Sequence, residues 1–238
     1  MTRKILVPFE LPDADPVSPV LVEDLASLAV VVLGHWTLPE QTPPSSARNE
    51  FEDEAQPELD ALAEPFEAAG AEVTTRLVFG RDRAKTIDRV ALEEDCDAEL
   101  DPAPTGGIDR ILVPLPMVES LGEIPEFVSV LAEDGSQEVT LFHVVEPGED
   151  RGEAEAMLAD AREAMVAAGF DTDRVDTELV EAEEHDDAIL EHAADFDAVV
   201  MHEATPRLRD RIFGTLPDRI ANQTRDPVII VRLEREGE

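Results

Sequence analysis

Two hydrophobic patterns alternate along the chain. Short runs of branched apolar residues are separated by longer segments in which apolar residues recur every three or four positions. The first pattern is typical of buried strands and the second of amphipathic helices. In the second half the predicted strands are 110–115, 138–145, 175–180, 198–201 and 228–231, and the predicted helices are 118–131, 153–168, 187–194 and 216–224. Strands that alternate with helices indicate βαβ units with right-handed crossovers.

The same order of elements occurs twice. Matching segments lie in register about 100 residues apart. The matched pairs are 4–8 with 110–114, 31–35 with 139–143, 68–70 with 167–169, 73–78 with 175–180, and 97–98 with 197–198. None of these matches is specific alone, but their shared order and spacing predict an internal repeat.

The first copy stops early. The Pro- and Gly-rich segment 101–107 leads directly into the first strand of the second copy, and the first copy has no counterpart of residues 202–233. Such a segment is a natural domain boundary. We therefore expect a truncated domain over 1–105, without its last helix and strand, and a complete domain over 106–238.

Each copy is expected to be a doubly wound α/β/α sandwich of three layers with a parallel sheet. A ligand of such a sheet would bind beyond the carboxyl ends of the strands. Inside the first copy, the Pro- and Ser-rich segments 11–19 and 39–49 are expected to be loops. Trp36 and Phe79 are expected to pack under the open edge of the truncated copy.

The chain is very acidic. Aspartate and glutamate number 56 against 19 lysine and arginine residues, which gives a formal net charge of −37. Such self-repulsion disfavours a compact fold at ordinary salt, whereas at about 1 M salt the Debye length falls to about 3 Å and the repulsion is screened. We therefore expect adaptation to a salt-rich cytoplasm, as in a haloarchaeon. The same charge argues against nucleic acid as a partner.

The sequence also points to a cytoplasmic protein that does not enter a membrane. No apolar run approaches the roughly 18 residues of a membrane span, and the N-terminus has no signal-peptide organisation. The single cysteine, Cys96, excludes an internal disulfide and fits a reducing compartment.

Several of these segments resemble the universal stress proteins, arranged in tandem. The resemblance rests on the Ile-Leu-Val-Pro opening that occurs twice, the histidines that end the second strand of each copy, and the Ala-Ala-Gly helix ends. The second copy adds the run 197–201, Phe213-Gly214-Thr215 before the last helix, and the closing strand 226–232. The resemblance implies a flavodoxin-like, or adenine nucleotide alpha hydrolase-like, fold with five parallel strands per domain and pairing between domains.

Some members of this family bind ATP, and the resemblance implies where such a site would lie. ATP-binding members have an Asp after the first strand, a Gly-x-x-Gly after the fourth, and Gly-Ser or Gly-Thr at the start of the last helix. Here Glu10 takes the Asp position in the first copy, and His202 takes the place of the first glycine in the second copy. Only Gly214 and Thr215 match the family pattern. A Cβ at a glycine position blocks close approach of a phosphate to the backbone, so the ATP site is expected to be degenerate.

Arginines are concentrated near the end of the chain. Between Pro206 and Arg232 the sequence has six arginines, Arg211 among them, and three aspartates. One interpretation is an anion or nucleotide site beside the last helix, which would include Arg211. The other is that these arginines form ion pairs with acidic neighbours across an interface.

The remaining candidates favour structural roles. The strand-end histidines His35 and His143 are expected to be hydrogen-bonded structural residues, Cys96 is expected to be a small buried residue, and no spacing indicates a metal site. The acidic runs 146–155 and 181–187 are expected to be solvated surface.

We therefore expect a non-enzymatic stress or regulatory protein that acts through protein association, as a homodimer or with a protein partner, and needs no cofactor. The alternative is an ATP- or ADP-binding sensor that uses the second domain.

Overall fold

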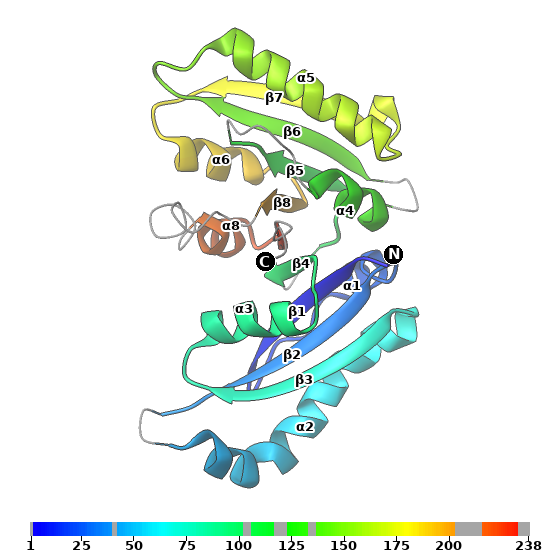
Figure 1. Ribbon diagram of the computed structural model, residues 1–238, viewed down its shortest axis with the longest axis vertical. Helices are drawn as coiled ribbons and strands as arrows, with labels where there is room; N and C mark the ends of the chain where they lie inside the picture. The colour runs from blue at the N-terminus through cyan, green and yellow to red at the C-terminus, as the bar shows by residue number, and fades with distance from the viewer. Residues whose placement is uncertain are drawn as a thin grey trace.

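The structure is a computed structural model that describes residues 2–39, 42–101, 106–116, 123–132, 137–202 and 216–232 (Figure 1). Its strands are β1 (Lys4–Leu11), β2 (Ala29–Thr37), β3 (Glu72–Gly80), β4 (Ala98–Asp101), β5 (Arg110–Pro114), β6 (Glu138–Val145), β7 (Val175–Glu181), β8 (Ala198–His202) and β9 (Val228–Val231). Its α-helices are α1 (Pro19–Asp24), α2 (Pro44–Ala69), α3 (Arg83–Glu93), α4 (Ile124–Leu131), α5 (Arg151–Ala167), α6 (His185–Ala193) and α8 (Leu216–Thr224), and a 3-10 turn covers Thr172–Arg174. The predicted alternation of strands and helices is confirmed.

The strands form one nine-stranded sheet in the order β3-β2-β1-β4-β9-β8-β5-β6-β7. Neighbours are parallel within β1–β4 and within β5–β9, but β4 and β9 are antiparallel. The chain is thus an α/β protein with a mostly parallel sheet. The two sheets predicted for the two copies are joined into one, so the prediction of two sandwiches with only parallel pairs is wrong at this junction.

Strand β9 pairs with the edge of β4 for which the sequence predicts no partner strand in the first copy. Leu100 pairs with Ile229, and Ala98 pairs with Val231. The junction continues past the strand, because the Arg232 amide donates to the Asp97 carbonyl oxygen at 2.8 Å. The last strand of the chain therefore completes the sheet of the first half as well as that of the second.

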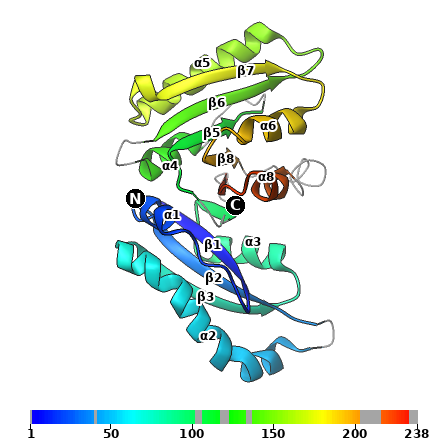
Figure 2. The ribbon, with the colours of Figure 1, turned by 180° about the vertical axis from the view of Figure 1, so that it is seen from behind.

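Helices cover both faces of the sheet (Figures 1 and 2). On one face α1, α2, α4 and α5 enclose a single apolar cluster that extends across both halves, from Phe66 to Met165. On the other face α3 packs over β1 and β2 around Leu33 and Val90, while α6 and α8 pack over the second half around Phe142. The continuous cluster predicts that both halves unfold together.

Details of the local structure recur in the two halves. Asp97 accepts a hydrogen bond from the Lys4 amide at 2.6 Å, and Asp197 accepts one from the Arg110 amide at 2.9 Å. Each aspartate thus fixes the start of the first strand of its half. A glycine with a positive φ follows each of the helices α2 and α5, Gly70 (98°) directly after α2 and Gly169 (114°) one residue further on after α5, a conformation that glycine adopts without a Cβ penalty.

Asp97 also contacts Arg3, and Arg3 connects the two halves. The Asp97 carboxylate lies 2.7 Å from Arg3, whose other terminal nitrogen lies 2.5 Å from Glu123 beside α4. Replacing Asp97 by alanine removes a charged acceptor and leaves the Lys4 amide without it, so we expect a loss of about 2 kcal/mol in unfolding free energy. Urea denaturation at fixed KCl measures this loss. Asp195→Ala, at an exposed turn, should change stability by much less, and equal effects would contradict the assignment.

Two expectations for the first half are wrong. Pro44 begins the long helix α2, so residues 44–49 are helical and not part of a loop, because proline fits the first turn of a helix. Trp36 stacks on Phe51 of α2 with ring centroids 5.0 Å apart and lies 6.2 Å from Phe79 of β3. This aromatic group lies on the β3 side of the sheet and not under the edge at β4.

Candidate functional site

A pocket of about 500 Å³ opens beyond the carboxyl ends of β5, β6 and β7 in the second half. Parallel strands present a ligand site at this edge of a sheet. The pocket is lined by Pro116, His143, Val144, Glu146, Glu149, Glu183, Glu184, His185, Asp186, Asp187 and Arg219. A pocket of this size holds a small organic molecule.

The pocket lining is acidic. Six of its side chains are carboxylates, and Arg219 is the only lysine or arginine among the described residues that line it. Arg219 Nη2 lies 2.6 Å from Asp187 Oδ1, and Nη1 lies 3.7 Å from Asp186 Oδ2. The charge of this arginine is therefore balanced by two carboxylates, and the four glutamates add negative charge that it does not offset.

His143 forms part of the pocket wall and is almost fully buried, with 1% of its surface exposed. Its Nδ1 lies 2.7 Å from the carbonyl oxygen of Leu115, so Nδ1 carries the proton of this hydrogen bond. The other ring nitrogen, Nε2, lies 3.7 Å from Glu149 Oε2 and has no hydrogen-bond partner in the part of the chain that the structure describes. The predicted structural hydrogen bond is thus present on one side of the ring.

His35 has the corresponding position in the first half and is fully buried. Burial lowers the pKa of His35 below its usual value, with smaller opposing effects from Glu10 and Asp82. Its Nδ1 lies 3.4 Å from the Thr37 hydroxyl oxygen. A neutral, buried imidazole agrees with a structural role at this strand end.

Of the sequence-predicted site residues, the structure describes Glu10 and His202, which lie in different halves of the chain. Glu10 lies exposed on β1, where it accepts a hydrogen bond from the Thr37 hydroxyl at 2.9 Å. His202 ends β8, is 9% exposed, and pairs with Val231. Neither residue lines the acidic pocket. The other predicted ligands, Arg211, Gly214 and Thr215, lie outside the described residues.

Sequence reasoning missed the acidic residues of the pocket. The acidic runs that contain Glu149 and Glu184 are typical of solvated surface, but in the structure they follow β6 and β7 directly. Their position after two neighbouring parallel strands is the signal that could have identified them, because such ends meet at one edge of the sheet.

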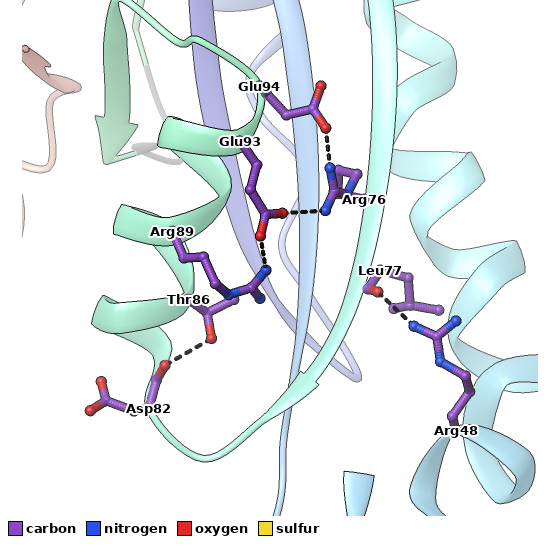
Figure 3. A network of polar contacts seen from close by, with 8 residues as sticks. All are labelled: Arg48, Arg76, Leu77, Asp82, Thr86, Arg89, Glu93 and Glu94. Atoms are coloured by element: carbon purple, nitrogen blue, oxygen red, sulfur yellow. Dashed lines mark hydrogen bonds and ion pairs between the residues drawn. The ribbon is translucent and has the colours of Figure 1, made fainter. Parts of the chain in front are cut away.

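Arginines in the described part of the chain form ion pairs. Arg219 pairs with two aspartates as above, and Arg232 Nη1 lies 3.9 Å from Glu99 across the β4–β9 junction. Figure 3 shows the same pattern between α3 and β3, where Arg76 contacts Glu93 and Glu94. Of the arginines between Pro206 and Arg232, Arg219 thus pairs within the second half and Arg232 pairs across the junction between the halves.

The described residues contain no group of three or more His, Cys, Asp or Glu side chains that could hold a metal ion. Their helices include none that is long and apolar enough to cross a bilayer.

Cys96 gives a second prediction. The thiol is buried, and this burial raises its pKa to about 12. Because the thiolate is the reactive form, iodoacetamide at pH 8 should alkylate Cys96 at least about a hundredfold more slowly in the folded than in the urea-unfolded protein. Mass spectrometry of timed samples measures both rates. Similar rates in the two states would contradict the buried placement.

The Universal stress protein family profile matches residues 107–232. Among solved structures, a universal stress protein from Archaeoglobus fulgidus aligns with 98% of this chain and 97% of its own, with a TM-score of 0.67 and 15% identity. This likeness shows the fold.

Another solved structure is a universal stress protein from Archaeoglobus fulgidus in complex with dAMP. It covers 51% of this chain and 96% of its own, at 20% identity and a TM-score of 0.40. No protein with a curated description matches the chain. Because the family profile covers more than half of the sequence and includes every strand that borders the pocket, the chain belongs to the universal stress protein family.

Proposed function

We propose that this protein is a non-enzymatic member of its family that acts in stress response or regulation through protein association, and that its nucleotide site is degenerate. The observation that carries the proposal is the charge of the pocket beyond β5, β6 and β7. Six carboxylates line it, and the one arginine of its described lining is already paired with two of them.

This lining disfavours a nucleotide for an electrostatic reason. Phosphate groups are bound in proteins by backbone N–H groups, helix N-termini and cationic side chains. Carboxylates near the same space repel a polyanion, and this repulsion is stronger where a pocket excludes part of the solvent. His202 supports the same conclusion, because it has a buried side chain where the family pattern has a glycine.

The proposal of a non-enzymatic role rests on the side chains available. Cys96 is buried with a raised pKa and is a poor nucleophile. The strand-end histidine His143 donates from Nδ1 to a backbone carbonyl oxygen, and no serine, threonine or cysteine of the described residues forms a hydrogen bond with it. A fold of this kind does not by itself confer an activity.

We further propose a tandem of two domains, with the first truncated and its sheet completed by β9. The repeated contacts of Asp97 and Asp197 support this organisation. The net charge of −37 supports a salt-rich cytoplasm, as in a haloarchaeon, as the working environment. A homodimer is the expected assembly, and light scattering at high salt would measure its mass.

The alternative function is a nucleotide-binding sensor that uses the second half. It is favoured by Arg219, which projects from α8 into the pocket wall shortly after Gly214 and Thr215 in the sequence. In that case phosphate would have to compete with Asp186 and Asp187 for this arginine.

A thermal-shift titration with ATP and Mg²⁺ in about 2 M KCl distinguishes the two functions. A ligand that binds only the native state stabilises it by RT ln(1 + [L]/Kd), so binding raises the Tm as ATP is added. We expect no rise beyond that caused by the same concentrations of MgCl2 and KCl. A saturable rise that Arg219→Gln abolishes would overturn the proposal in favour of the sensor.

A further inference from the structure

Two hydrogen-bond acceptors, one on His143 and one on Glu149, face each other inside the acidic pocket. The hydrogen bond to Leu115 places a proton of His143 on Nδ1, so in the neutral ring Nε2 carries a lone pair. Nε2 is buried, has no hydrogen-bond partner among the described residues, and faces the Glu149 carboxylate at 3.7 Å. A lone pair and a carboxylate oxygen both require a donor, and a buried acceptor without one is costly. With the ring neutral, the described residues place no donor between these two acceptors.

The Glu149 carboxylate is held in this position by its own loop. Its Oε2 accepts a hydrogen bond from the Glu146 amide at 2.8 Å, within the turn that connects β6 to α5. The turn therefore fixes one acceptor, and the Leu115 carbonyl fixes the other. A ligand that bridges them would meet a preorganised pair, which lowers the ordering cost of binding.

The rest of the pocket supplies further acceptors and an excess of negative charge. Glu146, Glu183 and Glu184 line the same space, and no lysine or arginine in the described ranges is recorded in an ion pair with them. A ligand that suits this lining carries positive charge and several N–H donors. A phosphate or a carboxylate ligand would meet only repulsion from these groups.

We propose that the pocket binds an organic cation with several N–H groups, that is, a diamine or polyamine. One ammonium group bridges His143 Nε2 and Glu149, and a second lies against the carboxylates that follow β7. A metal ion fits the pocket less well, because the described residues provide no group of three metal ligands. Binding of a polyamine in this pocket can be measured whether or not the protein associates with a partner protein.

Isothermal titration calorimetry with spermidine in about 1 M KCl tests the proposal, because exposed, non-specific attraction is screened at this salt concentration. We expect one saturable site per chain. Glu149→Gln keeps an acceptor for the Glu146 amide but removes the charge, and it should weaken spermidine binding about tenfold. Glu163→Gln makes the same charge change on an exposed site of α5 outside the pocket and should leave the affinity unchanged.

The imidazole of His143 gives an independent measurement that needs no variant. In ¹H–¹⁵N correlation spectra the unprotonated Nε2 resonance should move on addition of spermidine, in step with the calorimetric saturation. Three results would overturn the proposal. These are multiple weak sites without saturation, equal weakening by Glu149→Gln and Glu163→Gln, or a His143 ring protonated on both nitrogens before any ligand is added.

Discussion

Replacing Ile229 by alanine is expected to destabilise both halves of the protein together, by about 3 kcal/mol. Ile229 is fully buried in β9, between Leu100 on β4 and Val200 on β8. Its side chain belongs to the apolar cluster that extends across both halves. A cavity at this position therefore removes packing from the junction on which the sheet of the first half depends.

The single tryptophan makes this effect measurable in the half that does not contain the substitution. Trp36 lies on β2 and is the only tryptophan of the chain, so its fluorescence reports unfolding of the first half. In urea the fluorescence and far-UV circular dichroism transitions should coincide and move together in Ile229→Ala. Ile230→Ala, next along β9 but partly exposed, should cost less than half as much. A Trp36 midpoint that Ile229→Ala leaves unchanged would contradict the joined sheet.

Lowering KCl from about 2 M to about 0.1 M is expected to lower the Tm by more than about 10 °C, which for a chain of this size corresponds to roughly 3 kcal/mol or more. The chain has 56 carboxylates and 19 lysine or arginine residues, so one-to-one pairing leaves 37 carboxylates without a cation. The Debye length rises from about 3 Å at 1 M to about 10 Å at 0.1 M, and repulsion between neighbouring carboxylates then returns. Differential scanning calorimetry over a series of KCl concentrations measures the shift.

A control separates charge screening from the general effect of a concentrated solute. Sucrose stabilises folded proteins by exclusion from their surface and does not screen charge. It should therefore recover only part of the lost stability at about 0.1 M KCl. If the Tm changes by less than a few degrees across the KCl series, the interpretation of the charge as adaptation to salt is wrong.

Most elements of the fold could be predicted because their hydrophobic patterns are local. The bounds of β6, β9 and α8 coincide with the predicted segments, since each apolar run is flanked by turn or polar residues. The start of helix α2 is not predicted, because the proline- and serine-rich segment 39–49 is typical of a loop, whereas Pro44 begins the helix. It also contains Pro57 and Pro65, and its buried residues, such as Leu59, hold it against the sheet.

The junction between β4 and β9 could not be predicted in the same way. Both strands are short apolar runs, and nothing local in such a run specifies which strand edge it will pair with. The sequence indicates that the first copy lacks a strand, but Ile229, the residue that pairs with Leu100, lies 129 residues further along the chain. Long-range pairing of this kind depends on the packing of the whole chain.

The candidate site was predicted in part. His143 was recognised as a strand-end histidine, and the hydrogen bond to Leu115 agrees with that prediction. The carboxylates around it were not recognised, because an acidic run on a chain of this charge carries little information. The fold places Glu149 opposite His143 Nε2, and this position distinguishes it from the other acidic residues of the surface.

The nucleotide content of the protein purified from its own cells at high salt tests the central claim most directly. Acid denaturation releases any bound adenine nucleotide, and chromatography of the supernatant measures it against the protein concentration. The acidic lining of the pocket predicts far less than one nucleotide per chain. Close to one AMP, ADP or ATP per chain, retained through purification, would contradict a degenerate site and favour the nucleotide sensor.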